Sequence, residues 1–209
     1  MRGLRFISIA LASMHLAFIG CATSDCRLTP KNVRLVDLRI PDIGTKADWI
    51  ILTEGEETIE SGILVKEEID GILSYYWKGP NREITSVYDL KTMNWMGKWS
   101  HKNKEWTRRA TPHIGNKLFP LWAGKVFTSP FSYESKSGRS AQIKSLVTVE
   151  GWETVTVPAG TFETLRIFQE GPNFSVTYWY APKIGMDVKF ESSNIEGERS
   201  WKLMKIIEP

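Results

Sequence analysis

Short runs of Val, Ile, Thr and aromatic residues, separated by Gly, Pro, Asn and Asp, recur along the chain from about residue 47 onward. The last third shows the clearest alternation, in which Met186, Val188 and Phe190 are interleaved with Asp187 and Lys189. This is the pattern of a strand with one buried face. Turn signals follow one another about every eight to twelve residues, as in all-β proteins. The pattern predicts an all-β fold, either an antiparallel β-barrel or a sandwich.

Turn chemistry divides this pattern into elements. The dipeptide Asp70-Gly71 lies between two apolar runs, at residues 63–69 and 72–77. Both of its positions tolerate a positive φ, so we expect a two-residue hairpin there. Two prolines and a serine-rich stretch predict loops at residues 111–120 and 129–140.

The first twenty residues follow a different pattern, that of a signal peptide. Arg2 and Arg5 precede a mostly apolar stretch at residues 6–19. A helix needs about 20 residues to cross the hydrocarbon core, so this stretch is too short for a stable membrane span. It has the length of the apolar region of a signal peptide, which is removed from the mature protein.

The end of that stretch, Phe18-Ile19-Gly20-Cys21, resembles the lipobox of bacterial lipoproteins. The resemblance implies that the thiol of Cys21 receives a diacylglyceryl group, and that the amine freed by cleavage can be acylated too, for example with palmitate. The alternative is ordinary cleavage after Ala22, which would leave a soluble periplasmic protein. We favour lipidation because the cysteine directly follows the apolar run. Cys26 is interpreted as a lone thiol.

These features predict three parts of the chain: a lipoprotein signal peptide at residues 1–20, a lipidated tether at 21–46, and a single antiparallel β domain at 47–209. Two or more acyl chains give a stable membrane anchor. By resemblance to enterobacterial lipoprotein sorting, Ala22 rather than Asp after the cysteine implies the outer membrane, with the domain facing the periplasm.

Charge and composition exclude some functions. The chain of 209 residues has 27 basic and 24 acidic side chains, and two of the basic ones lie in the predicted signal peptide. The remainder is therefore nearly neutral, which argues against a nucleic-acid partner, because that requires a concentrated basic face. The content of 42% hydrophobic and 24% charged residues is typical of an ordinary globular domain.

Two segments of the last third resemble motifs of uncharacterised bacterial envelope lipoproteins. One is GWETVTVPAGTF at residues 151–162, and the other is YWYAPKIG at residues 178–185. Upstream, FPLWAGK at residues 119–125 is similar to a segment that such chains often carry. The resemblance implies a periplasmic antiparallel β-barrel or half-barrel. It implies no catalytic residues, and the prolines and glycines of these motifs are sufficiently explained as turn formers.

Sequence motifs for catalysis are not evident. Nucleotide-binding glycine loops, the nucleophile elbow of hydrolases and the spacings of zinc ligands do not occur. We therefore expect no catalytic residue, no metal site and no cofactor, although a carboxylate pair gathered from distant strands stays open as a hydrolase site. On balance the sequence favours a protein that is not an enzyme.

The chain is unusually rich in tryptophan, with nine residues, and several of them fall in one expected hairpin. Strands at residues 93–99 and 105–109 flank a polar turn at 101–104, a register that pairs Trp99 with Trp106. Trp95 has the same parity as Trp99, so we expect both on one face, with Lys98 beside them. Filling of the core is one explanation. The other is an exposed aromatic and basic binding face made by Trp95, Trp99, Trp106 and Lys98.

Three functional classes remain open from the sequence. The first is a non-catalytic binding or carrier module for lipid or glycan, anchored to the membrane, with protein partners unspecified. The second is a structural or assembly partner of an envelope complex that acts through its edge strands. The third is a hydrolase. An internal apolar cavity would favour the first class, and an uncovered edge strand the second.

Overall fold

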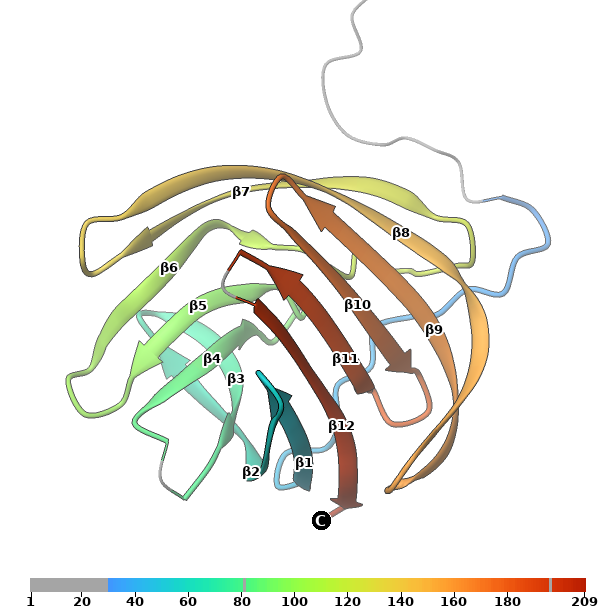
Figure 1. The fold of residues 1–209 in the computed structure, drawn as a ribbon, viewed down its shortest axis with the longest axis horizontal. Coiled ribbons are helices and arrows are strands. Elements are labelled where there is room, and N and C mark those ends of the chain that lie inside the picture. Colours follow the sequence, from blue (N-terminus) through green and yellow to red (C-terminus); the bar gives the residue numbers. More distant parts are fainter. Residues whose placement is uncertain (1–29, 81, 196) are drawn as a thin grey trace, which may run out of the picture.

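The computed structural model describes residues 30–80, 82–195 and 197–209. These residues form twelve strands that close into one antiparallel barrel (Figure 1). Each strand pairs with its neighbours in the sequence, and β1 pairs with β12 to complete the ring. The strands are β1 (Lys46–Thr53), β2 (Glu56–Ile69), β3 (Ile72–Lys78), β4 (Ile84–Asp89), β5 (Trp95–Ser100), β6 (Glu105–Ile114), β7 (Val126–Ser135), β8 (Ser140–Val157), β9 (Gly160–Gly171), β10 (Phe174–Ala181), β11 (Met186–Asn194) and β12 (Gly197–Ile207).

This architecture confirms the expected all-β antiparallel fold in a single domain, and of the two forms considered it is the barrel. Within the described part of the chain, no helix has the length and apolar character needed to cross a bilayer.

Local turn chemistry explains the hairpins. Asp70 and Gly71 have φ values of 53° and 75° and join β2 to β3. Glu54 and Gly55 form the β1–β2 turn in the same left-handed region, at 52° and 85°. Such turns match the right-handed twist of paired strands, which is why glycine and aspartate are favoured in them. The hairpin expected at residues 70–71 is therefore confirmed.

The loops expected at residues 111–120 and 129–140 are only partly confirmed, because strands run through residues 111–114 and 129–135. β6 continues to Ile114, and β7 covers residues 126–135. Pro130 pairs with Lys144 of β8, but the hydrogen-bonded register between β6 and β7 begins only at Ser132. Proline is tolerated where a strand lacks a partner on one side. Ser129, Ser132 and Ser135 therefore belong to β7, whereas Ser137 lies in the turn that leads to β8.

The motifs at residues 151–162 and 178–185 each contain a turn, and the second also contacts the N-terminal segment. Gly160 has a φ of 137° and follows the Pro158-Ala159 turn between β8 and β9. Gly185 has a φ of 71° and precedes β11. A Cβ atom on Gly185 would lie 2.8 Å from the carbonyl oxygen of Arg39, so only glycine lets the N-terminal segment approach so closely.

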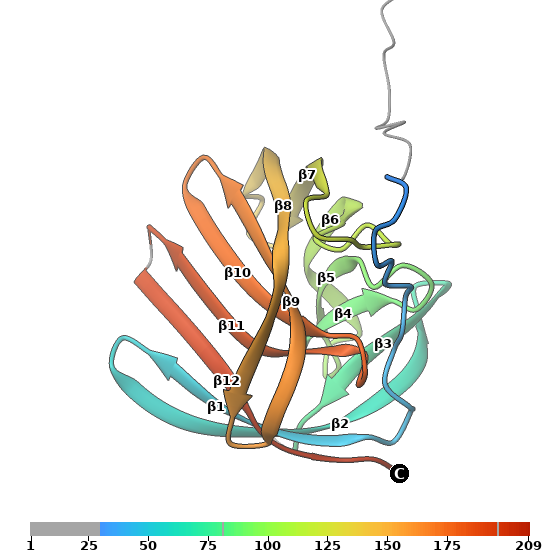
Figure 2. The ribbon, with the colours of Figure 1, turned by 90° about the vertical axis from the view of Figure 1, so that its right-hand side faces the viewer.

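One end of the barrel is closed by two segments outside the strands. Residues 30–45 and the β6–β7 loop at residues 115–125 meet there, where Val36 and Leu121 exchange two backbone hydrogen bonds of 2.8 Å. Both side chains are buried. Tyr180 of β10 donates a hydrogen bond of 3.1 Å to the carbonyl of Arg39. Part of the segment interpreted as a tether therefore lies against the barrel, as Figure 2 shows.

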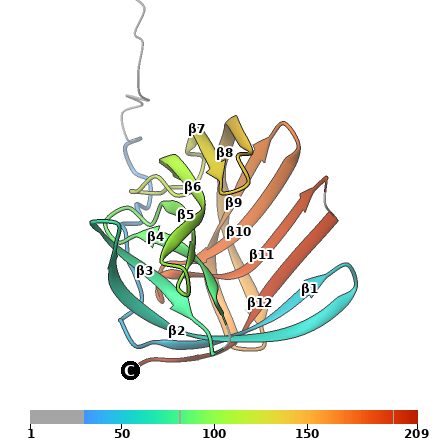
Figure 3. The ribbon, with the colours of Figure 1, turned by 90° about the vertical axis from the view of Figure 1, so that its left-hand side faces the viewer.

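The opposite end carries the β1–β2 and β9–β10 turns, away from the N-terminal segment (Figure 3). Pairing is weakest in one part of the wall, since β3 and β4 share only the pairs Ser74–Asp89 and Tyr75–Tyr88. The two strands diverge beyond these pairs. Arg82, which follows β3, forms an ion pair with Glu60 of β2 beside this divergence.

Candidate functional site

A cavity of about 460 Å³ lies inside the barrel. Eleven of the twelve described strands contribute lining residues, all except β8, so the cavity is a central space and not a surface groove. Its floor includes Pro41, Lys117 and Gly185, from the segments that close one end of the barrel. Arg82 and Arg199 line it on the opposite side, where the residues are exposed. This volume is typical of sites for small molecules, about 300–1,000 Å³.

Aromatic side chains are the largest group among the residues that line the cavity. Trp49 and Trp77 meet edge to face with centroids 4.8 Å apart. Phe190 lies edge to face with Tyr178 at 5.5 Å and stacks on Trp201 at 5.7 Å. The aromatic lining comprises Trp49, Tyr75, Trp77, Tyr88, Trp95, Phe131, Phe174, Tyr178, Phe190 and Trp201. These side chains alternate with residues on the other face of each strand, as the β pleat requires.

The floor of the cavity holds a buried ion pair. Nζ of Lys117 lies 2.9 Å from Oδ2 of Asp187, and the two side chains are 5% and 17% exposed. Lys117 comes from the β6–β7 loop and Asp187 from β11. Nζ of Lys117 also lies 4.5 Å from the ring centroid of Tyr178, a cation–π contact. The pair joins the closing loop to the wall of the barrel.

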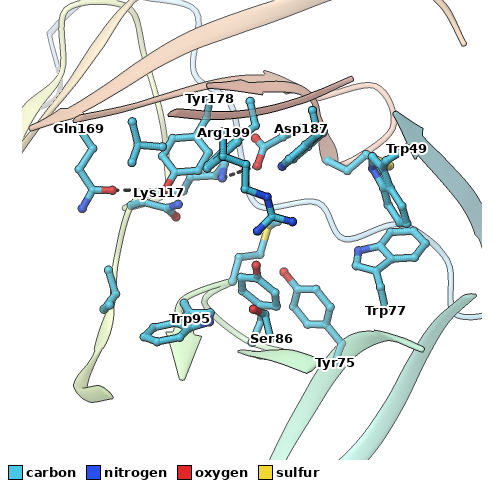
Figure 4. A pocket seen from close by; sticks show the side chains of 18 of the residues that line it. Trp49, Tyr75, Trp77, Ser86, Trp95, Lys117, Gln169, Tyr178, Asp187 and Arg199 are labelled. Carbon is cyan, nitrogen blue, oxygen red and sulfur yellow. Dashed lines mark hydrogen bonds and ion pairs between the residues drawn. The ribbon is translucent and has the colours of Figure 1, made fainter. Parts of the chain in front are cut away.

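Tyr75, Tyr88 and Tyr178 line the same cavity as this ion pair, and Figure 4 labels Tyr75 and Tyr178. Burial, with a smaller contribution from the nearby carboxylate of Asp187, raises the pKa of Tyr88 to about 12. Burial also raises the pKa of Tyr75 and of Tyr178 well above the usual range, with Asp187 again contributing. Ionisation of each group would place an anion in a poorly hydrated site beside a carboxylate. The three hydroxyls therefore stay protonated near neutral pH and can both donate and accept hydrogen bonds.

The exposed side of the cavity carries two guanidinium groups. Arg82 pairs with Glu60, while Arg199 reaches from β12 over the cavity (Figure 4). Burial lowers the pKa of Arg82, and the positive charge of Arg199 lowers it further. Within the described residues, no carboxylate forms a salt bridge with Arg199. One cation in the mouth of the cavity is thus free to contact a ligand.

The structure separates the residues of the expected tryptophan face. Trp95 lines the cavity, whereas Trp99 and Trp106 pack together at 5.2 Å in a second apolar cluster, with Tyr76 and Met96. The predicted pairing of Trp99 with Trp106 is confirmed.

The expectation that Trp95 and Trp99 share a face is wrong. Met96 is an extra residue in β5, where the register shifts against both neighbouring strands between Trp95 and Gly97; the second shift against β6 falls at Thr107 of β6. An irregularity of this kind re-aims the side chains that follow it. Trp95, Trp99 and Trp106 are all partly buried, and Lys98 is exposed.

The predicted lipidation site, Cys21, lies outside the described residues, as do residues 1–20 and Cys26. The lipid anchor therefore stays a prediction from the sequence. Within the described residues, no group of three His, Cys, Asp or Glu side chains is placed to hold a metal ion.

Sequence reasoning missed most of the cavity. Tyr75 and Trp77 alternate within the expected strand at residues 72–77, a signal that could have placed both rings on one face. Asp187 alternates with apolar residues and looked like an ordinary solvent-facing side chain. Lys117 lies in a loop with no periodicity, so no local pattern could indicate that it is buried.

The chain matches no protein-family model and no curated protein sequence. It resembles several solved structures, including the following three. An exported protein of Bacteroides fragilis, described as having a YmcC-like fold, is 15% identical with a TM-score of 0.49, covering 83% of this chain and 100% of that one.

The second solved structure is described as a lipoprotein of Parabacteroides distasonis, with 12% identity, a TM-score of 0.44 and the same coverage of 83% and 100%. The third is the hypothetical lipoprotein YmcC of Escherichia coli, with 12% identity, a TM-score of 0.46 and coverage of 78% of this chain and 87% of that one. Likeness at this level carries no inference of function, so function is argued from the cavity.

Proposed function

We propose that this protein is a ligand-binding module of the bacterial cell envelope, anchored by lipid at Cys21, whose barrel interior holds a lipid or a glycan. The cavity carries the proposal: about 460 Å³ of space enclosed by aromatic rings, with a small number of polar groups at its two ends. Proteins that fold only for stability fill their interiors at crystal-like density. A central space of this size is therefore best explained by an occupant.

An assembly role through edge strands is less well supported. β1 and β12 pair over eight residues of β1, from Lys46 to Thr53, and this pairing closes the sheet on itself. The closed ring offers a partner strand only short free stretches, where β3 and β4 diverge and where β7 precedes its pairing with β6.

A hydrolytic role is also less well supported. The cavity is lined by the carboxylates of Glu60 and Asp187, and each forms an ion pair, with Arg82 and Lys117 respectively. Glycosidases need one carboxyl group held protonated as a general acid. A carboxylate stabilised by a neighbouring cation is poorly suited to that role.

Native mass spectrometry of protein purified from its own membrane tests the proposal. We expect the wild-type protein to carry an additional non-covalent mass. Ser86→Trp, which places an indole in the cavity from β4, should lose this mass. Thr128→Trp is the matched control, because Thr128 is an exposed strand residue of β7, and it should retain the mass. Absence of bound mass from the wild type, or equal retention by both variants, would contradict the proposal.

The anchor has its own test. We expect Cys21→Ala to abolish incorporation of a labelled fatty acid and to move the protein from the membrane fraction to the soluble fraction. Cys26→Ala should change neither, because no lipobox precedes Cys26. Equal labelling of the Cys21 variant and the wild type would overturn lipidation at Cys21.

A further inference from the structure

We infer, on the basis of the proposed binding function, that the ligand of the cavity is a saccharide and not an acyl chain. The argument begins with Asp187. Its Oδ2 atom accepts a hydrogen bond from Lys117, but its Oδ1 atom is buried and has no hydrogen-bond partner among the described residues. A buried carboxylate oxygen without a donor is costly. Oδ1 has almost no accessible surface of its own, so a rotation of the Asp187 side chain, which is 17% exposed, is needed to bring this oxygen to a hydroxyl donor of a ligand.

The surroundings of this oxygen suit a ligand with many hydroxyl groups. Tyr75 and Tyr88, which stack with centroids 5.3 Å apart, line the cavity near Asp187 and keep their hydroxyls protonated. On the other side, Gln169 and Tyr178 add an amide and a third hydroxyl, with 3.4 Å between Tyr178 Oη and Gln169 Oε1. These groups both donate and accept, as do the hydroxyls of a sugar.

The aromatic side chains of the cavity suit the apolar face of a sugar ring. One face of a pyranose ring presents several C–H groups, which pack on the flat face of an indole or phenol. The cavity offers such faces on several sides, from Trp77, Trp95, Phe174 and Trp201 among others. Ten of the 25 lining residues are aromatic, whereas only five are Ile, Val or Met, and unbranched acyl chains are well accommodated by such aliphatic side chains.

The polar groups at both ends of the cavity also favour a saccharide over an acyl chain. An acyl chain bound lengthwise would place one apolar end either on the Lys117–Asp187 pair or among Arg82, Glu60 and Arg199. It would also leave Oδ1 of Asp187 unpaired. A short oligosaccharide has hydroxyl groups along its whole length, so it can satisfy the floor and the mouth together. The free guanidinium of Arg199 adds a preference for a saccharide that carries an acidic group.

The experiment compares two probes on the intact protein: an array of neutral and acidic bacterial glycans, and a fluorescent fatty acid. The wild type should bind glycans on the array and should not bind the fatty acid. Tyr75→Phe removes one cavity hydroxyl and should weaken glycan binding by roughly fivefold to tenfold. Tyr133→Phe, a change at a partly buried tyrosine that does not line the cavity, should leave glycan binding unchanged.

A second variant inverts the preference. The double substitution Lys117→Met with Asp187→Leu makes the floor apolar without leaving a lone buried charge. It should lose glycan binding and acquire binding of the fatty acid. Wild-type binding of the fatty acid with no glycan signal would overturn the saccharide inference while leaving the proposed binding function intact. Binding of neither probe, together with the absence of a co-purified mass, would overturn both.

Discussion

Lys117 and Asp187 lie 70 positions apart in the sequence and form an ion pair of 2.9 Å at the floor of the barrel cavity. The lysine belongs to the loop that closes one end of the barrel, and the aspartate belongs to the wall. The same contact therefore holds the closing loop in place and fixes the carboxylate of Asp187 beside the cavity. Stability and ligand recognition are coupled at this point.

Removal of one partner should be strongly destabilising. Lys117→Met leaves the carboxylate of Asp187 buried without its cation, and we expect the free energy of unfolding to fall by about 3–5 kcal/mol. Lys183→Met, at an exposed lysine in the neighbouring β10–β11 turn, should change it by less than about 0.5 kcal/mol. Urea denaturation of the two variants measures both values. Similar small effects would show that the ion pair does not hold the loop.

The buried tyrosines predict a loss of stability at alkaline pH. The pKa of Tyr88 is raised from 10.0 to about 12 by burial, so its phenol contributes its full stabilisation below pH 10.0 and loses it as the pH rises toward 12. Over that interval the free energy of unfolding should fall by up to about 1.4 kcal/mol per pH unit from this group. Urea unfolding at stepped pH should show a shallower fall for Tyr88→Phe. Identical slopes for variant and wild type would contradict the burial of this hydroxyl.

The contact between Gly185 and the N-terminal segment can be tested against a glycine that has space around it. Gly71→Ala adds a Cβ with nothing within 4 Å, at a φ of 75°, and should cost about 1 kcal/mol for backbone strain alone. Gly185→Ala has a similar φ of 71° but must also displace the carbonyl of Arg39. We expect it to cost at least about 1 kcal/mol more. Equal losses in urea denaturation would mean that the segment is not held against the barrel.

The two groups of tryptophans should behave differently. Trp99→Ala removes a ring from the cluster that contains Trp106, and we expect a loss of about 3 kcal/mol, at the low end for buried aromatics because the ring is partly exposed. Retention of the co-purified ligand should not change. Trp95→Ala should reduce that retention, because Trp95 lines the cavity. Thermal unfolding and native mass spectrometry of the two variants separate these outcomes, and the reverse result would assign the ligand to the Trp99–Trp106 pair.

Local signals explain why much of the fold could be predicted. The Asp70-Gly71 turn specifies its own hairpin, and the polar turn before Glu105 was enough to set the pairing of Trp99 with Trp106. Closure of the barrel depends on β1 and β12, which lie at opposite ends of the domain and carry no mutual signature. Whether the sheet forms a barrel or a sandwich was therefore open from the sequence.

The site was less predictable, for two physical reasons. The extra residue Met96 in β5 reverses the face on which Trp95 lies relative to Trp99, and one inserted residue leaves little trace in a pattern of alternation. The burial of Lys117 results from a loop that folds across the end of the barrel, a tertiary arrangement that neither propensity nor periodicity encodes. Four of the nine tryptophans, Trp49, Trp77, Trp95 and Trp201, line the cavity, and only Trp95 belongs to the hairpin that the sequence singled out.

The most direct test of the central claim is a crystal structure of the protein purified from its native membrane without exchange of its ligand. Occupancy of the barrel interior predicts continuous non-protein density between Trp77, Trp95 and Tyr178, with a donor atom within hydrogen-bond distance of Oδ1 of Asp187. A cavity that contains only ordered water, or one that is closed by inward movement of the aromatic side chains, would contradict the claim that this barrel is a ligand-binding site.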